Sequence, residues 1–321
     1  MKNNKMLNWG LLSTYRQALM GGSILLIMLY HSFHESSNGT ITRFFVTGKM
    51  GVELFLILSG IGIYYSLSKC DSLLVFYKKR ILRILPEYLL VSLPIYLVLT
   101  VYKGDTIWNF ILNISMLNFL WGEGAYFWFV HLIIVCYLIA PFYFKLHTKE
   151  VLYKSMPLIV LLMSYIISYY YPAYQMILPR YAAFILGMTL GQFVMNNNVI
   201  PLGRIIVWAW PFVVTLLYLS TYKGECYGLW IEPIYYFFFS IPLMIYMTLL
   251  LFKNARVCSI FGFLGSISLE LYLLHEIFFL KVAKMFFYND IVICIVSIIT
   301  AVPFAFLLSM INSYILKWIN K

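Results

Sequence analysis

Histidine and carboxylate side chains recur near the ends of long apolar segments in this chain. One segment, RQALMGGSILLIMLYHSFH, carries His31 and His34, and the next, GKMGVELFLILSGIGIYYSLSK, carries Glu53. A histidine can act as a general base near neutral pH, and a nearby carboxylate orients its ring and makes it more basic. Ionisable side chains inside a membrane segment are costly, so they indicate function. We therefore predict that His31 is a catalytic base and that Glu53 orients it.

The composition is that of a membrane protein. Of the 321 residues, 63% are hydrophobic and 11% are charged, which excludes a soluble globular domain. The formal net charge is +11, but the basic residues stand mostly in short loops between apolar runs, where they report membrane orientation rather than nucleic-acid binding. The five cysteines are scattered, without a C-x-x-C pair, so we expect neither a disulfide framework nor a metal site.

Apolar runs of membrane-spanning length predict ten helices in one all-α membrane domain, residues 1–321, with no appended soluble domain. The helices are expected near 15–33, 48–68, 81–100, 126–144, 155–171, 178–195, 205–220, 232–252, 260–279 and 291–316. The segment 106–121 is shorter and more polar, and its tryptophans favour an interfacial or re-entrant position. Ten spans put both termini on one side, where fifteen Lys and Arg fall against seven opposite. The positive-inside rule then places both termini in the cytoplasm.

This topology brings ionisable residues from separate helices to a similar depth near the outer face. His31, for example, lies about 24 Å beyond Tyr15 along the first helix. Glu53 and Glu232 stand at the same level, as do the residues that we expect to line the site: His34, Trp128, His131, Arg180, His275 and Glu276. A lone membrane histidine can equally be a packed, hydrogen-bonded one, and His34 or His131 at a helix end can simply face water. The shared depth favours a functional site.

The main charge cluster on the predicted cytoplasmic side is KKRILR, residues 78–83. A membrane-orientation signal explains its lysines. Arg80 and Arg83, three residues apart, stand just ahead of Pro86 and Glu87. Arginine binds phosphate through two parallel hydrogen bonds, so we predict a phosphorylated cytosolic ligand there.

Five motifs, taken in order, resemble the acyltransferase-3 family of bacterial membrane O-acyltransferases. They are the helix ending in YHSFH, then GVELFLILSGIGIYYSLSK, FYKKRILRILPEYLL, YFWFVHLIIVCYLIAPF and SISLELYLLHEIF. Their order and spacing cover nearly the whole chain. The resemblance implies a multi-pass, ten-helix domain in the bacterial cytoplasmic (inner) membrane. It also implies transfer of an acyl group, usually acetyl, from cytosolic acyl-CoA to hydroxyls of cell-surface or extracellular glycans.

The resemblance also implies roles for individual residues. His31 corresponds to the family's catalytic histidine and Glu53 to the acidic residue of its second helix. Arg80 and Arg83 correspond to the RxxR pair associated with the donor, and His275 to the late histidine.

One position departs from the family pattern. The family has an arginine separated by ten residues from the histidine, and this position is Met20 here. Arg16 lies four residues earlier, one turn away on the same helix face and about 6 Å along the axis. We predict that the flexible Arg16 side chain takes over the role in donor binding; the alternative is a site with a different donor geometry.

We therefore expect an O-acyltransferase with acyl-CoA as co-substrate, a saccharide or polysaccharide acceptor and no bound cofactor. The alternative is a proton-coupled transporter or flippase, because buried His and Glu also form proton relays. The sequence shows no internal repeat and no matched pair of Gly/Pro-broken helices, which disfavours that class. A purely structural or sensor protein would not need so many ionisable groups at one depth. The residues leave open the acceptor, the acyl chain, the oligomeric state and whether His31 itself carries the acyl group.

Overall fold

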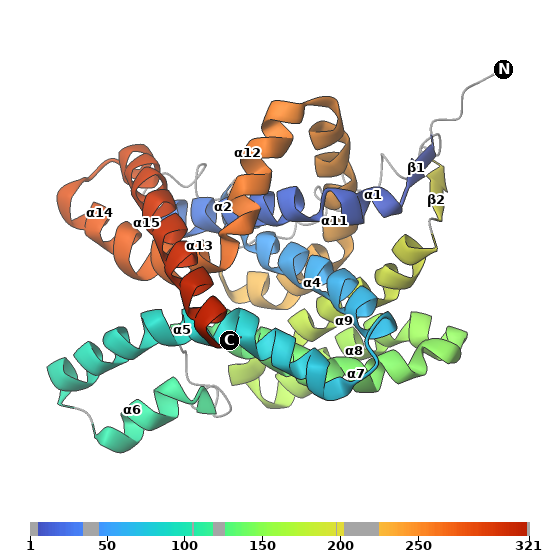
Figure 1. Ribbon diagram of the computed structural model, residues 1–321, viewed down its shortest axis with the longest axis horizontal. Helices are drawn as coiled ribbons and strands as arrows, with labels where there is room; N and C mark the ends of the chain where they lie inside the picture. Colours follow the sequence, from blue (N-terminus) through green and yellow to red (C-terminus); the bar gives the residue numbers. More distant parts are fainter. Residues whose placement is uncertain are drawn as a thin grey trace. The chain divides into compact units, whose positions relative to one another are not determined.

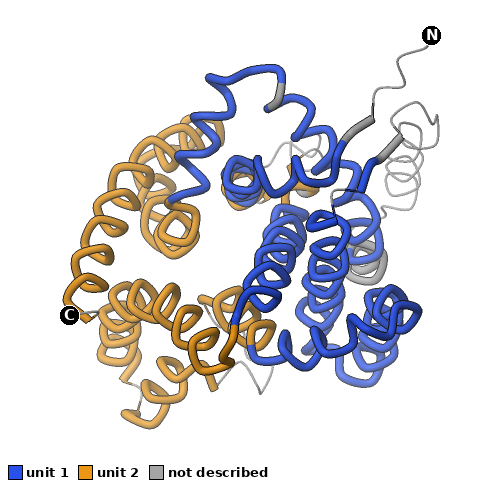
Figure 2. Tube along the Cα trace, turned by 45° about the vertical axis from the view of Figure 1, so that its right-hand side comes forward, with its two compact units in different colours: residues 1–27, 49–70, 138–266 blue, residues 28–48, 71–137, 267–321 orange. Residues whose placement is uncertain are grey.

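The computed structural model describes residues 6–34, 45–104, 106–117, 126–196, 198–201 and 225–319. Two compact units divide the chain: residues 1–27, 49–70 and 138–266 form the first, and residues 28–48, 71–137 and 267–321 form the second (Figure 2). The regular secondary structure of the described residues is helical except for strands β1 (Met6–Asn8) and β2 (Val199–Pro201), which pair antiparallel in the first unit. Apart from this short pair, the all-α prediction is confirmed.

Helix α4 (Gly51–Ser68) forms the core of the first unit, and its residues 51–61 are all buried. Helix α9 (Leu178–Met195) lies beside it (Figure 1). Their backbones approach closely, because a Cβ atom on Gly60 would overlap the Phe184 carbonyl oxygen and one on Gly187 would overlap that of Ile57. Small residues at such contacts are typical of packing between membrane helices. This contact fixes the position of Glu53 on α4 relative to Arg180 on α9.

The first unit also contains the beginning of α2 (Arg16–Phe33), together with α1 (Gly10–Thr14), α8 (Glu150–Tyr170), α11 (Glu225–Lys253) and α12 (Ala255–Ser266). Short 3-10 helices of this unit cover Lys145–Thr148 and Pro172–Tyr174, and another, Val46–Met50, spans the chain boundary between the units at residue 49. Helix α8 is joined to α9 by a hydrogen bond of 3.0 Å from the Tyr153 hydroxyl to the Met188 carbonyl oxygen. Glycines again allow a close contact between α2 and α12, where Gly265 faces the Gln17 backbone.

Two long helices, α5 (Leu73–Lys103) and α15 (Asp290–Ile319), dominate the second unit. The unit also contains α6 (Ile107–Ile114), the first part of α7 (Trp128–Phe144), α13 (Ser268–Leu274), a π-helix (His275–Leu280) and α14 (Lys281–Phe286). Helix α5 begins eight residues before the predicted start at 81. The physical reason is that Lys and Arg are good helix formers, so the basic run 78–83 continues the helix instead of forming a loop.

Six described helices are long and apolar enough to cross a membrane, or up to seven if the bent pair Ala255–Ser266 and Ser268–Phe286 is one span. The six cover Thr47–Ser68, Leu73–Lys103, Trp128–Thr148, Glu150–Tyr170, Pro233–Leu251 and Asp290–Ile319. The predicted spans 15–33 and 178–195 are helical too, but they carry more polar side chains and are not among the six. The predicted span 205–220 lies outside the described residues. The count of ten and the cytoplasmic termini therefore stay predictions.

Candidate active site

Histidines from two distant segments come together in the second unit. The Nε2 atom of His31, on α2, lies 3.6 Å from Oε2 of Glu276. The His31 ring is centred 5.3 Å from the His275 ring and 6.0 Å from the His34 ring. Tyr30 lies against both His31 and His34. The arrangement puts an imidazole beside a carboxylate, as expected of a general base.

The π-helix positions His275 and Glu276. A π turn contains an extra residue and reorients the side chains that follow, and it is frequent at functional sites. His275 is buried, and its Nδ1 lies 3.0 Å from the Leu271 carbonyl oxygen. A carbonyl oxygen only accepts, so Nδ1 donates and carries the proton. Among the described residues the buried His275 Nε2 has no hydrogen-bond partner, and in the neutral ring this atom is an acceptor.

His31 and Glu276 are both accessible enough to meet a substrate. Their side chains are 18% and 43% exposed, respectively. A separation of 3.6 Å is longer than a hydrogen bond but short enough for electrostatic attraction when the imidazole is protonated. The Glu276 carboxylate therefore favours the positively charged imidazolium that forms when His31 accepts a proton.

Glu53 is held by Arg180 in the first unit. Its Oε1 accepts a hydrogen bond of 3.2 Å from Arg180 Nε, and both side chains are buried. A second donor of the same guanidinium, Nη1, bonds the Met176 carbonyl oxygen. The pair borders a cavity of about 30 Å³, together with Lys49, Gln175, Pro233 and Tyr236, which has room for about one water molecule. Because His31 belongs to the second unit, the predicted orientation of His31 by Glu53 stays a prediction.

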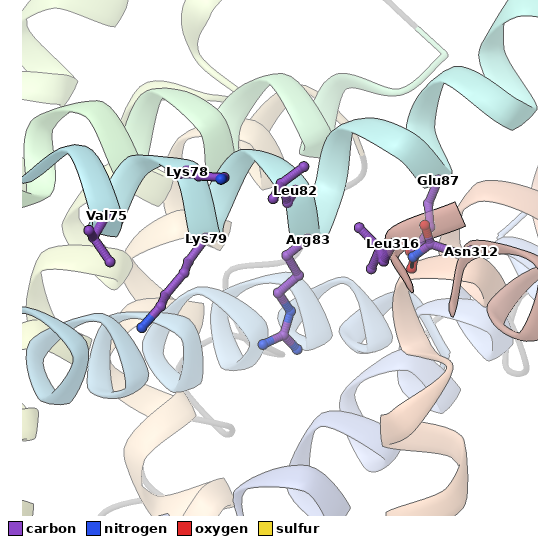
Figure 3. Close-up of a pocket in the computed structure, with 8 residues that line it drawn as sticks. All are labelled: Val75, Lys78, Lys79, Leu82, Arg83, Glu87, Asn312 and Leu316. Atoms are coloured by element: carbon purple, nitrogen blue, oxygen red, sulfur yellow. Dashed lines mark hydrogen bonds between the residues drawn. The ribbon is translucent and has the colours of Figure 1, made fainter. Parts of the chain in front are cut away.

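Three basic residues of α5 line a cavity of about 630 Å³ in the second unit. Lys78, Lys79 and Arg83 contribute its positive charge, and Asn312 of α15 lines it too. Figure 3 shows the Lys79 and Arg83 side chains directed to the same side, while Glu87 and Asn312 meet at one end. There the Asn312 side-chain amide donates a hydrogen bond to the Glu87 carboxylate. The cavity can receive an anionic group at its lysines and arginine.

Arg80, the other member of the predicted pair, has different surroundings from Arg83. Its guanidinium carbon lies 5.6 Å from the centre of the Phe76 ring and 5.9 Å from that of Tyr137, which are cation–π distances. It is not one of the residues that line the 630 Å³ cavity. A role of Arg80 in donor binding stays a prediction.

Arg16 belongs to the first unit. Its Nε donates a hydrogen bond of 2.8 Å to the Leu58 carbonyl oxygen, and its guanidinium lies against Gly62. Arg16 therefore links α2 to α4. Its predicted replacement of an arginine at Met20 in donor binding stays a prediction.

The comparison with protein families decides the class of this chain. The sequence model of the acyltransferase-3 family, which describes an acyltransferase domain, matches residues 19–318. The chain belongs to the acyltransferase-3 family. Comparisons of this acyltransferase with the curated proteins and with solved structures gave no match. The family, together with several helices of membrane length, makes it a multi-pass membrane acyltransferase, and favours this class over the transporter or flippase.

Two further residues predicted to line the acyltransferase site, Trp128 and His131, stand in the first turn of α7. His131 is buried, and its ring is centred 6.3 Å from the Tyr88 ring. The Trp128 ring packs at 6.1 Å from that of Phe129. Their roles stay predictions, and the side chain of Glu232 lies outside the described residues.

Two buried carboxyl groups of the acyltransferase were not predicted as site residues. Glu87 of α5 and Glu270 of α13 interact with one another and with Arg83, and the Ser309 side chain hydrogen-bonds Glu270. The signal was present in the sequence, because both stand in apolar runs, ILPEYLL and SLELYLL. The same criterion that selected Glu53 would have found them.

Proposed function

We propose that this acyltransferase moves an acyl group, acetyl in the simplest case, from cytosolic acyl-CoA to a hydroxyl of a cell-surface or exported saccharide. We place it in the bacterial cytoplasmic membrane, with His31 as the general base. The observation that carries the proposal is the His31–Glu276 pair at 3.6 Å, inside the segment that matches the family. The family supplies acyl transfer as the reaction class, and the pair supplies a partly exposed base with a carboxylate partner.

Glu276 favours the His31 tautomer with its proton on Nε2, which leaves Nδ1 to take the proton of the acceptor hydroxyl. As the acceptor hydroxyl loses this proton, its oxygen attacks the carbonyl carbon of the thioester. A carbon–oxygen bond forms and the carbon–sulfur bond breaks, giving an ester and the coenzyme A thiolate. The imidazolium then returns its proton to the thiolate, and His31 is neutral again.

A second route uses the same residues in two steps. The basic nitrogen of His31 attacks the thioester, forms an acyl-imidazole and releases coenzyme A, and the acceptor hydroxyl then takes the acyl group. The routes differ in whether labelled acyl groups accumulate on the protein. Rapid quenching after mixing with radiolabelled acetyl-CoA in the absence of acceptor separates them, because only the second route leaves label on His31.

We assign the donor phosphates to the cavity at Arg83, with Lys78 and Lys79. The support is its positive charge and its volume of about 630 Å³, which is within the range of pockets for small molecules. Guanidinium groups bind phosphate through paired hydrogen bonds. Arg80 is proposed to assist, as the family resemblance implies. Arg16 is proposed to take the place of the arginine that the family has at the position of Met20.

The test compares acetyl-CoA turnover by purified wild type and His31→Ala, with saccharide acceptors. We expect the turnover rate of the variant to be lower by a factor of about 10² to 10⁴, the usual contribution of general acid–base catalysis. His147→Ala is the control, because His147 lies in the 3-10 helix Lys145–Thr148, in the other unit, and should keep full activity. Full activity in folded His31→Ala would refute the role of His31 as the base. A wild-type protein that does not turn over the thioester would refute acyl-CoA as the donor.

A further inference from the structure

Two buried carboxyl groups of the second unit lie beside one another at one end of the 630 Å³ cavity. Glu87 of α5 is 7% exposed and Glu270 of α13 is 3% exposed. Their side chains are hydrogen-bonded to one another, and Glu87 lines the cavity (Figure 3). The proposed acyl transfer uses neither group. A buried carboxyl group in a membrane segment is costly, so it indicates a function of its own.

The contacts of this pair require a proton between the two carboxyl groups. Glu87 accepts a hydrogen bond at Oε1 from the Asn312 amide, and the Ser309 side chain bonds Glu270. The Glu87 Oε2 atom is buried, and no N–H or hydroxyl group of the described residues donates to it. Ionised carboxylate oxygens only accept hydrogen bonds, so two ionised groups would repel and could not bond each other. Glu87 and Glu270 therefore share a proton, as carboxyl groups in close contact do.

Arg83 is the cation beside the pair. It stands four residues before Glu87 on the same face of α5, and it attracts both carboxyl groups electrostatically. Its positive charge favours the ionised form of the pair. Helix α15 contributes the neutral side chains of Asn312 and Ser309. Further titratable groups on the same elements are Lys78 and Lys79 of α5 and, beyond α13, His275 and Glu276.

Phosphate groups in the cavity compete with the carboxyl pair for Arg83. The proposed function assigns the donor phosphates to Arg83, Lys78 and Lys79, and the present inference rests on that assignment. A phosphate at Arg83 compensates the positive charge that favours ionised carboxyl groups, and it adds negative charge close to them. Both effects favour protonation of the pair. Because Glu87 lines the cavity, solvent in the cavity can deliver the proton.

We propose that Glu87 and Glu270 form a proton-binding site coupled to the donor, so that binding of acyl-CoA drives uptake of a proton by the pair. The proton comes from the solvent as the phosphates bind, and it returns to the solvent when coenzyme A leaves. By linkage, the proton and the donor strengthen the binding of one another by the same factor. Donor affinity therefore rises as the pH falls through the range in which the pair exchanges its proton.

The experiment is isothermal titration calorimetry of the purified full-length protein in detergent. The probe is S-ethyl coenzyme A, a thioether that carries no thiol proton and cannot transfer an acyl group. At pH 8 its phosphate groups, whose second ionisation is near pH 6, are fully ionised and exchange no proton. HEPES and Tris differ in enthalpy of ionisation, so the difference in observed binding enthalpy gives the number of protons taken up. We expect roughly 0.3–1 proton per bound ligand.

Two variants and one control assign the proton to the pair. Glu87→Gln with Glu270→Gln keeps side chains that can hydrogen-bond each other, and it should abolish the uptake and tighten the ligand at least threefold. Arg83→Gln should lose most of the uptake, because the ligand and the pair no longer share a cation. Glu150→Gln is the control, because Glu150 is an exposed carboxylate on α8 in the first unit; it should keep the wild-type uptake. Thermal melting checks that each variant is folded.

Equal binding enthalpies of the wild type in the two buffers would show that no proton is taken up and overturn the inference. Uptake that persists in the folded double variant would assign the proton to another group and overturn it as well. In both cases the ligand binds, so the proposed donor stands. A wild-type protein that does not bind S-ethyl coenzyme A would refute the donor assignment itself, and this inference with it.

Discussion

The imidazole of His31 and the carboxylate of Glu276 face one another at 3.6 Å, from helices near opposite ends of the chain. The pairing depends on the π-helix His275–Leu280, which sets the direction of the Glu276 side chain. A carboxylate at this distance stabilises the imidazolium and selects one tautomer of the neutral ring. It makes Glu276 a positioning residue for the proposed reaction.

Replacing Glu276 should therefore lower kcat more than it changes KM. We expect Glu276→Gln to reduce kcat by about 10- to 100-fold, a part of the 10² to 10⁴ that a general base contributes. Glu276→Asp keeps the charge and should retain more activity. Steady-state kinetics at saturating donor, with the melting temperature of each variant, check the expectation. A Gln variant that retained more activity than the Asp variant would indicate a purely steric role.

The matching substitution Glu53→Gln tests the prediction made from the sequence. If Glu53 orients His31, kcat of the folded variant falls about as far as in Glu276→Gln. If Glu53 serves only to hold Arg180, which it contacts at 3.2 Å, the melting temperature falls and kcat per folded molecule does not. Because kcat and the melting temperature are measured separately, they distinguish a role in orienting His31 from a role in holding Arg180.

The two arginines of α5 should differ in donor binding. Arg83→Gln removes a cation from the 630 Å³ cavity, and we expect coenzyme A affinity to fall about 10- to 100-fold, the loss of about 1.5–3 kcal/mol from a hydrogen bond to a charged group. Arg80→Gln removes a guanidinium that lies against Phe76 and Tyr137, so we expect a smaller change in affinity. Isothermal titration calorimetry with coenzyme A measures both. A larger loss in Arg80→Gln would reverse this assignment.

The sequence predicted the reaction class and most of the helices, because ionisable residues in apolar runs and five ordered motifs are local features. It predicted Glu276 only as a residue lining the site, and not as the carboxylate beside His31. Glu276 and Glu53 carry the same local signal, and the contact of Glu276 with His31 depends on the packing of helices distant in the sequence. The π-helix was equally hidden, since LYLLHEIFFL is uniformly suited to an ordinary helix.

The basic run 78–83 shows a second limit. Its charges suggested a loop before a helix, whereas α5 already begins at Leu73. The spacing of three residues suggested that Arg80 and Arg83 act together, but one lies against aromatic rings and the other lines a cavity. Neighbouring side chains, which the sequence does not reveal, decide where each guanidinium lies.

The contact between α2 and α12 should not tolerate a side chain larger than hydrogen. A Cβ atom on Gly265 would overlap the Gln17 backbone oxygen, and the two backbones must move apart. We expect Gly265→Ala to destabilise the protein by about 1–3 kcal/mol, the usual cost of overpacking. Gly262→Ala, on the same helix, meets nothing within 4 Å and should be neutral or slightly stabilising. Thermal melting in detergent compares them, and equal melting temperatures would contradict this contact.

The buried pair of Glu53 and Arg180 should show strong coupling. Arg180→Met removes the guanidinium that bonds Glu53 at 3.2 Å, and breaking a buried ion pair on one side costs about 3–5 kcal/mol. Adding Glu53→Gln removes the buried charge too, so the double variant should recover part of this loss. A double-mutant cycle on the free energy of unfolding in detergent measures the coupling. Additive effects of the two substitutions would show that the pair does not hold α4 to α9.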